Sequence, residues 1–475
     1  MKPINITLNQ YDMFKMELDK IVNKKDSLIM LANLINWDFF HNEFSEAFKG
    51  KTGKPPKSIR LVTGLLMLKY VYNYSDYQVI FNLERNVYFQ YFCGYFTIQN
   101  TQLISRSSLV KFRSKIGETG AELIFKHIIE LSKKLGILKK GEGKVITDTT
   151  AVEKNIKYPT DIELLEKTRK NLVKEGKKYG LIKRDKYSKE GPKIRSEALR
   201  HAKGNKKDLL EEKKSYQKKM LKETLDRIIN IKKKPSKIES KTEPKIETIP
   251  IPFEINPEST EKSSSVNKHE DIQNNLKDNE HISKALTNQI DNSIRLLYQQ
   301  KGSKNKLYSN YEPQTYCIAK GKANKKYEYG HKLSIVIDHS SGILLSSKAI
   351  LANKYDGDIL DESITKAEEI TETNIKEIYA DKGYRKKTKG KQGTEGTIKK
   401  DQILYISGTK SKNKRIKKDK KRRSLVESRI SELKRMCRGS INYLKGTIGD
   451  KINASLVGLA ENIRIIMRHL SVKLN

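Results

Sequence analysis

Hydrophobic residues recur at spacings of three and four along the first 140 residues, a pattern that predicts a series of short helices. One helix is expected to begin at Ile59, and another follows Ser75, which has the sequence position of an N-cap. Two further apolar runs flank Gly117. Short helices with aromatic content and basic flanks are typical of a helix-turn-helix-like DNA-binding unit, and equally of an ordinary helical bundle.

The pattern changes to strands at about residue 145. β-Branched and apolar residues surround Asp148, and later segments alternate between apolar and polar positions. The expected elements are a strand over 145–150, a hairpin of 333–337 and 343–351, a helix over 357–371, a strand over 375–380 that ends at Asp381, a strand over 402–407, and a mostly helical segment over 420–470.

A Lys-rich segment of about 160–310 separates the first strand from the hairpin. Its leucines are thinly spread among charges, which predicts two long helices up to about residue 230 and another over 282–297. Five prolines between about 233 and 270 predict a disordered linker. Without this insertion, the order of strands, helices and acidic residues is that of the RNase H-like fold.

The amino-acid composition indicates which kind of binding partner the chain has. The 475 residues include 96 Lys and Arg against 57 Asp and Glu, a net charge of +39 that favours a polyanion, with DNA or RNA ahead of an anionic membrane surface. The apolar run Ile59–Tyr74 is too short and too charged to span a bilayer, and we identify no signal peptide. Three scattered cysteines without metal-ligand or redox spacing favour a reducing compartment.

Three carboxylates are candidate metal ligands: Asp148, Asp381 and Glu427. Cleavage of a phosphodiester by two Mg²⁺ ions about 4 Å apart needs carboxylates that converge from several elements. Each acid also has a simpler interpretation. Asp148 and Asp381 could cap turns, and Glu427 could form a surface i,i+4 pair with Arg423.

The helix expected around Glu427 has two distinct stripes. At 100° per residue, Arg423, Glu427 and Lys434 share one stripe. The adjacent stripe is apolar and is expected to be buried, and it comprises Val426, Ile430, Leu433 and Cys437. Glu427 is therefore expected at the edge of the packed face, where a metal ligand should lie.

A basic run precedes this helix. Nine of the thirteen residues from Ser411 to Arg423 are Lys or Arg. Such a run is usually a solvated loop, but beside a phosphodiester-cleaving site it favours contact with phosphates. The candidate DNA-binding residues in this run are Lys417, Lys418, Lys420, Lys421 and Arg422, with Arg423 at its end.

Arg423, Glu427 and Lys434 resemble the Y-x2-R-x3-E-x6-K signature of DDE transposases in the insertion-sequence four/five superfamily. Lys420 stands where that signature has Tyr. Four further segments resemble, in the same order, blocks of its five-type or eleven-eighty-two-type branch: VITDTTAVEKNIKYPTD (145–161), IAKGKANKKYEYGHK (318–332), YADKGYR (379–385) and YLKGTIGDKINA (443–454).

The resemblance implies an α/β RNase H-like catalytic core, an all-α N-terminal domain, and a large helical insertion between the first and second core strands. The expected domains are a helical DNA-binding domain over 1–140, the first core strand with Asp148 over 141–159, the insertion over 160–310, and the remaining core with the C-terminal helices over 311–475.

The implied function is that of a bacterial transposase, which binds the ends of its insertion-sequence element and catalyses metal-dependent cleavage and strand transfer. Asp148, Asp381 and Glu427 would hold Mg²⁺, for which Mn²⁺ can substitute, and Arg423 and Lys434 would contact phosphates near the scissile bond. The implied partners are double-stranded DNA of the ends and the target, and a second copy in a synaptic homodimer. Location in the cytoplasm at the nucleoid, without a membrane, is expected.

Three other interpretations stay open. The first is a catalytically decayed or regulatory DNA-binding protein derived from a transposase, against which the presence of all three acids and of the Arg423–Lys434 pair argues. The second is a basic RNA-binding protein, which gives no reason for the acids in and after the strands. The third is an RNase H-like nuclease that does not transpose DNA.

Overall fold

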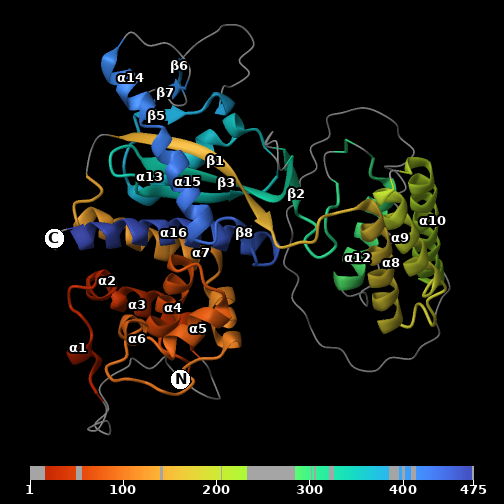
Figure 1. Ribbon diagram of the computed structural model, residues 1–475, viewed down its shortest axis with the longest axis horizontal. Helices are drawn as coiled ribbons and strands as arrows, with labels where there is room; N and C mark the ends of the chain where they lie inside the picture. Colours follow the sequence, from red (N-terminus) through yellow and green to blue (C-terminus); the bar gives the residue numbers. More distant parts are fainter. Residues whose placement is uncertain are drawn as a thin grey trace. The chain divides into compact units, whose positions relative to one another are not determined.

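A computed structural model describes residues 16–49, 56–139, 143–204, 206–232, 284–300, 302–303, 306–319, 326–352, 354–384, 395–397, 402–407 and 413–472. The described residues form two compact units. The first unit joins Met1–Asn155 to Tyr316–Asn475, and the second consists of Ile156–Thr315. A strand-rich core and the helices at both ends of the chain belong to the first unit (Figure 1).

The described part of residues 16–139 is helical, as the periodicity predicts. The Ser75 side chain accepts a bond from the Gln78 backbone amide and completes a capping box, which confirms the predicted N-cap. Gly117 has φ 61° and ψ −157°, which breaks the long helix between its two apolar runs. The helices are α1 Leu18–Ile21, α2 Ser27–Leu34, α3 Trp37–Ser45, η1 Glu46–Phe48, α4 Ile59–Val71, α5 Asp76–Leu83, α6 Val87–Phe92 and α7 Arg106–Lys134.

One eight-stranded mixed sheet forms the centre of the first unit, in the order β2-β3-β1-β5-β7-β6, with β4 beside β3 and β8 beside β1. Its strands are β1 Lys144–Lys154, β2 Tyr316–Ala319, β3 Tyr327–Asp338, β4 Leu344–Ile350, β5 Glu377–Ala380, β6 Glu395–Thr397, β7 Ile403–Ile406 and β8 Ile441–Asn442. Strand β1 pairs antiparallel with β3 and parallel with β5, and β5 pairs parallel with β7. The series β4-β3-β1-β5-β7 is the strand order of an RNase H-like core.

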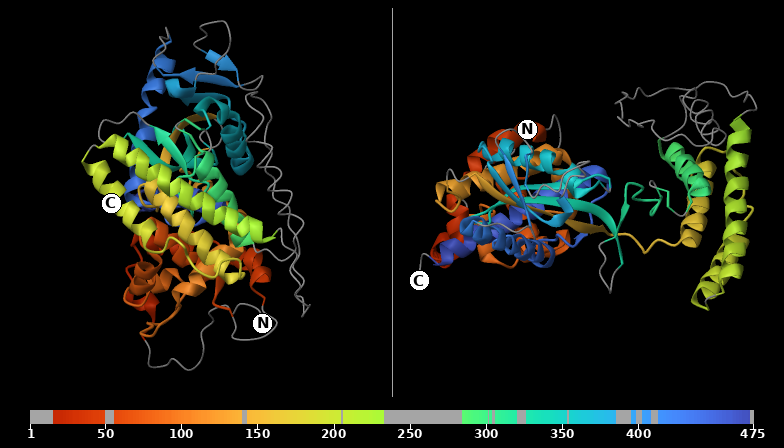
Figure 2. Two further views of the ribbon diagram at one scale, coloured as in Figure 1. Left: turned by 90° about the vertical axis from the view of Figure 1, so that its right-hand side faces the viewer. Right: turned by 90° about the horizontal axis from the view of Figure 1, so that it is seen from above.

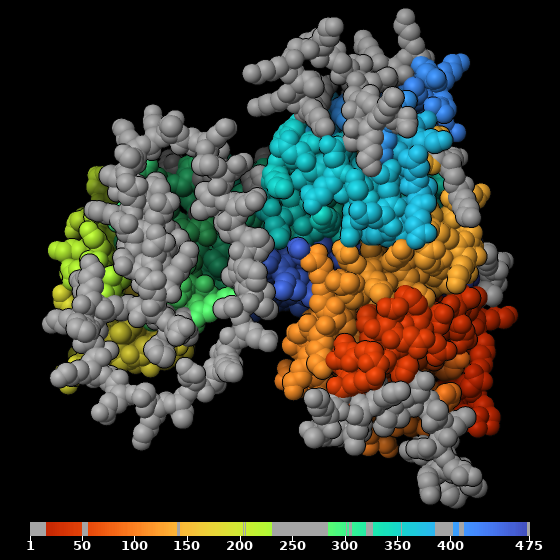
Figure 3. Space-filling model, turned by 180° about the vertical axis from the view of Figure 1, so that it is seen from behind, coloured from red at the N-terminus to blue at the C-terminus, as the bar shows by residue number. Residues whose placement is uncertain are grey.

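Helices cover this sheet. Helix α13 Leu360–Thr371 packs on β3 and β4, and α16 Gly446–Val472 packs on β4, α4 and α7. Two ion pairs join α7 to the α13 region, Lys126–Glu372 at 3.1 Å and Lys366–Glu122 at 3.0 Å. Figure 3 shows the N-terminal helices in red and orange against the cyan strand-and-helix region. One continuous hydrophobic core therefore runs from the N-terminal helices into the sheet.

The second unit is helical, with α8 Asp161–Lys178, α9 Glu190–Lys203, α10 Lys207–Lys232 and α12 Lys284–Tyr298 (Figure 2). The prediction of two long helices before residue 230 was wrong, because three helices occupy this range. The chain leaves α8 through Gly180, which has φ 68°, and Asp185 then accepts the Tyr187 amide, so the loop turns back into α9. The predicted helix near 282–297 is confirmed by α12, and the predicted linker over 233–270 lies outside the described residues.

The buried residues of the second unit explain how so polar a sequence folds. Leu172, Leu221 and Ile290 are fully buried in its core. Arg169 is 1% exposed and donates to Glu166 and Asp185, so its charge is compensated inside the bundle. A small apolar core and internal ion pairs thus hold a unit whose surface carries many lysines.

The structure describes two further features considered from the sequence, the three cysteines and the apolar helices. Cys93 and Cys437 are fully buried and Cys317 is half-buried, and none of the three forms a disulfide. Within the described residues, no helix has the length and apolar character required to cross a membrane.

Candidate active site

The sheet register brings two of the three candidate acids together. Asp148 lies inside β1, and Asp381 directly follows β5. The parallel pairing runs from Lys144 opposite Glu377 to Ile146 opposite Tyr379, so its continuation places Asp148 level with Asp381. Neighbouring strands lie about 4.8 Å apart. The two carboxylates therefore start from adjacent strands at one height of the sheet.

Hydrogen bonds orient both aspartates. One oxygen of Asp148 accepts the Thr149 backbone amide at 2.7 Å, and its side chain is 20% exposed. Asp381 accepts the Ser407 hydroxyl at 2.8 Å. Burial alone would raise the pKa of Asp381, but the Ser407 hydroxyl, the Lys382 backbone amide and the charge of Arg423 together lower it below its usual value. Asp381 is accordingly held as a carboxylate.

The third acid comes from α15, which spans Ser424–Met436. Val426, Leu433 and Cys437 are fully buried and confirm the predicted apolar stripe, whereas the Glu427 side chain is 58% exposed. Glu427 lies in the first turn, where the helix dipole favours a negative charge. Arg423, the N-cap of α15, lies 3.9 Å from the Asp148 carboxylate, so the helix begins beside this aspartate.

Arg423 connects the three acids. Its guanidinium donates to Glu427 at 2.5 Å and lies 3.9 Å from the Asp148 carboxylate. It is also one of the charges that act on Asp381. The surface i,i+4 pair considered from the sequence is therefore present, but it is only one side of a larger arrangement in which one guanidinium faces three carboxylates.

The donor chemistry suits a divalent cation, because three carboxylates supply the hard oxygen ligands that Mg²⁺ prefers. The arrangement is not a closed metal centre. Across the described ranges, no group of three or more His, Cys, Asp or Glu side chains is close enough to hold an ion. Where such a group would form, the Arg423 guanidinium contacts the carboxylates.

The described part of the basic run, from residue 413 onward, forms α14, Lys414–Lys421, and not the solvated loop considered from the sequence. Its acidic residue, Asp419, faces the core: its carboxylate lies 3.3 Å from the Tyr379 hydroxyl, 3.7 Å from the Lys144 ammonium and 4.0 Å from His339. Arg415 pairs with Glu377 at 3.0 Å. Asp419 thus anchors a helix whose lysines point elsewhere.

The predicted DNA-binding residues occupy different settings. Lys417, Lys418 and Lys421 are exposed, Lys420 lies 5.7 Å from the Tyr405 ring centroid, and Arg422 donates to the Ser340 carbonyl. Lys434 is half-buried on α15, two turns beyond Glu427. The structure places Arg423 beside the acids, whereas Lys417, Lys418 and Lys421 form a separate exposed set on α14.

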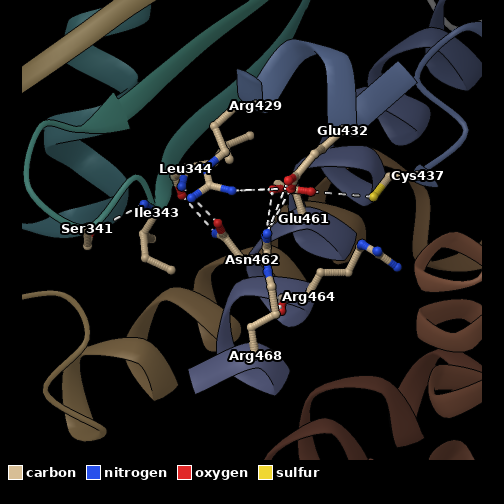
Figure 4. Close-up of polar contacts among 10 residues, drawn as sticks. All are labelled: Ser341, Ile343, Leu344, Arg429, Glu432, Cys437, Glu461, Asn462, Arg464 and Arg468. Carbon is tan, nitrogen blue, oxygen red and sulfur yellow. Dashed lines mark hydrogen bonds and ion pairs between the residues drawn. The ribbon is translucent and has the colours of Figure 1, made fainter. Parts of the chain in front are cut away.

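A cluster of arginines and carboxyl groups around the buried Glu461 fixes the position of α15 (Figure 4). Arg429 donates to Glu432 at 3.2 Å and to Glu461 of α16 at 3.0 Å, and Arg468 reaches Glu432 at 2.9 Å. Burial and the neighbouring Glu432 raise the pKa of Glu461 to about 8. Cys437 contacts the same carboxyl at 3.8 Å.

This cluster is connected to the sheet through α16. Asn462 exchanges two hydrogen bonds with the backbone of Leu344 in β4, at 2.8 and 2.9 Å (Figure 4). The sheet therefore positions α16, and α16 positions the helix that carries Glu427.

Sequence reasoning missed Ser407, Asp419 and Glu461. Ser407 directly follows β7, the strand parallel to β5, and could have been inferred from that pairing alone. Asp419 interrupts a basic run, which is a recognisable signal for an inward-facing side chain. Glu461 gives no signal, because its partners lie elsewhere in the sequence.

The comparisons with known proteins agree with this architecture. Residues 302–462 match the family described as Transposase DDE domain, and residues 16–115 match a family described as a transposase domain. The first match includes Asp381 and Glu427, whereas Asp148 lies before it and joins the same sheet through β1. The chain belongs to the bacterial DDE transposase family.

Among its relatives is an uncharacterized protein, ORF8 of the nfe locus of Rhizobium meliloti. The two are 32% identical over 203 residues, which cover 42% of this chain and 98% of the relative. No match was found among solved structures.

Proposed function

We propose that this protein cleaves the ends of its insertion-sequence element and joins them to target DNA, with Asp148, Asp381 and Glu427 as the metal-binding carboxylates. The observation that supports this most directly is the level placement of Asp148 and Asp381 on adjacent strands, with Arg423 between Asp148 and Glu427. The order of the flanking sequence blocks supports the insertion-sequence four/five superfamily and its five-type or eleven-eighty-two-type branch.

In this proposal, bound Mg²⁺ or Mn²⁺ would supply an activated water or hydroxyl nucleophile and stabilise the leaving oxygen. Asp148 and Asp381 would hold the cation from the sheet, and Glu427 would hold it from α15. The Ser407 hydroxyl orients Asp381, and the Thr149 amide orients Asp148. Arg423, Lys434 and the α14 residues Lys417, Lys418, Lys420, Lys421 and Arg422 would contact DNA phosphates.

The helices within residues 16–139 are proposed to recognise the element ends. Helix α5 exposes Tyr77 and Phe81, 58% and 40% accessible, and cations lie over both rings. The Arg85 guanidinium is 3.7 Å from the Phe81 ring centroid, and that of Arg106 is 5.8 Å from the Tyr77 ring. Exposed aromatic side chains on one short helix, with the cations of Arg85 and Arg106 beside them, are suited to contacts with a nucleic acid. Two copies would hold the two ends in a synaptic homodimer.

The test is incubation of the purified full-length chain with its flanking element ends and Mg²⁺, followed by mapping of the cuts. Asp381→Asn should remove the cuts while gel-shift affinity for the ends is retained. Glu369→Gln, which changes an exposed acid on α13, is the control and should cut like the wild type. DNA binding without any cut by the wild type would favour the catalytically decayed DNA-binding protein and overturn the proposed activity.

A further inference from the structure

Arg423 contacts the same carboxylates that the proposed cation would need. Its guanidinium lies 2.5 Å from Glu427 and 3.9 Å from Asp148, and only 20% of its side chain is accessible. A guanidinium and a divalent cation compete for carboxylate oxygens, because both are attracted by the same negative charge. The local charge arrangement therefore already contains a cation supplied by the protein itself.

Arg423 is also placed to leave this position. It stands at the junction of α14 and α15, where it is the N-cap of α15 and its side chain makes no cap hydrogen bond. The preceding helix presents the exposed cations Lys417, Lys418 and Lys421. A duplex held by that face brings phosphates to Arg423, and a guanidinium binds phosphate as well as it binds a carboxylate.

We propose that Arg423 is an internal competitor for the metal, which DNA removes: its guanidinium occupies carboxylate oxygens of Glu427 and Asp148 until a DNA phosphate takes it over, and the carboxylates then bind the divalent cation more tightly. This inference rests on the proposed function. It adds a coupling between DNA and metal. Because such coupling is reciprocal, the cation must raise affinity for DNA by the same factor by which DNA raises affinity for the cation.

The coupling has a functional consequence. A transposase that binds its cation tightly only when DNA is present keeps its nucleophile-activating site weak away from a substrate. Arg423 thereby acts as a positioning residue with two alternative partners, the carboxylates and the phosphate. Lys434, on the same stripe of α15 but two turns away, is not placed to exchange partners with Glu427 in this way.

The test measures Mn²⁺ binding to the full-length chain by electron paramagnetic resonance of the free ion, with and without a short DNA duplex. Arg423→Gln should bind Mn²⁺ up to about fivefold more tightly than the wild type without DNA, the range expected when a partly exposed ion pair is released. Added DNA should then change its Mn²⁺ affinity little. Arg423→Lys, which keeps the positive charge, should stay near the wild type.

Arg435→Gln is the matched control, because it removes the same charge from the same helix, about 18 Å along the axis from Arg423. It should bind Mn²⁺ like the wild type. Unchanged or weaker Mn²⁺ binding by Arg423→Gln would overturn the competition.

The double variant Asp148→Asn with Arg423→Gln separates this failure from failure of the proposed function. If it binds Mn²⁺ as tightly as Arg423→Gln alone, Asp148 holds no cation, and both the proposed site and the competition are wrong. If it loses Mn²⁺ binding while Arg423→Gln matches the wild type, the site is upheld and only the competition is wrong.

Discussion

Helix α15 takes part in two clusters of arginines and carboxylates that differ in burial and in charge balance. At its first turn, the single guanidinium of Arg423 faces Asp148, Asp381 and Glu427, and the Glu427 side chain is 58% exposed. Further along the helix, Arg429 and Arg468 donate hydrogen bonds to Glu432 and Glu461, and Glu461 is completely buried.

The difference shows how the same types of side chain, arginines and carboxyl groups, serve different purposes in the two clusters. The second cluster is closed around the fully buried Glu461: a raised pKa keeps a proton on this carboxyl, so two guanidinium groups face the single negative charge of Glu432. The open cluster has more negative than positive groups and is accessible, so it retains affinity for another cation. A cluster closed around a buried, protonated carboxyl fixes structure, whereas an exposed cluster with an excess of negative charge can bind a cation.

The largest expected effect belongs to the open cluster. Glu427→Gln should lower cleavage of element ends about 1,000-fold or more, because the loss of a metal ligand costs several kcal/mol of transition-state stabilisation. Its melting temperature and gel-shift affinity should match those of the wild type, since Glu427 is exposed. Cleavage at the wild-type rate would remove Glu427 from the proposed site, and Glu369→Gln is an exposed control.

Breaking the closed cluster should instead reduce stability. Arg429→Met removes a hydrogen-bond partner of the buried Glu461, and such a loss costs about 1–3 kcal/mol of the free energy of unfolding. Urea unfolding measures this loss of free energy, and Arg435→Met, which changes an exposed arginine on the same helix, is the control. Equal stabilities for the two variants would show that the closed cluster is not the structural anchor of α15.

The pH dependence of stability should also distinguish the clusters. The folded chain holds the Glu461 proton up to a pKa of about 8, whereas the unfolded carboxyl releases it near 4.5, so this group makes stability fall as pH rises between these values. Glu461→Gln has no such proton, and its stability curve should be flatter by up to about 1.4 kcal/mol per pH unit. Urea unfolding from pH 5 to pH 9 measures the slope, and a variant as steep as the wild type would contradict the assignment.

The smallest expected effect concerns α14, which lies next to the open cluster. Replacing the exposed Lys417 and Lys418 with Gln should flatten the salt dependence of DNA binding by up to about 1.8 units and weaken specific and random DNA alike. The same double replacement at Lys174 and Lys177 of α8 is the control and should leave the slope unchanged. A selective loss of binding to element ends would make α14 a specificity element.

Local sequence patterns determined the order of elements well. Strand β1 around Asp148, the hairpin of β3 and β4, helix α13 and strand β5 before Asp381 all occur where alternation and helical spacing predict them. Side-chain periodicity depends only on residues close together in the chain, so it can be recognised from the sequence alone. The loop between α8 and α9 was not predicted. Lysines dominate the sequence on both sides of it, so no apolar stripe shows where one helix ends and the next begins.

The candidate acids came from the sequence, but their relationship to each other came from the fold. Nothing near Asp148 in the chain indicates that it is level with Asp381, because that depends on the register between β1 and β5. Nor does the sequence show that Arg423 reaches both Glu427 and Asp148, or that Glu461 is buried against Glu432. Charge balance and burial arise only when distant segments pack together, and they decide which cluster is closed and which is open.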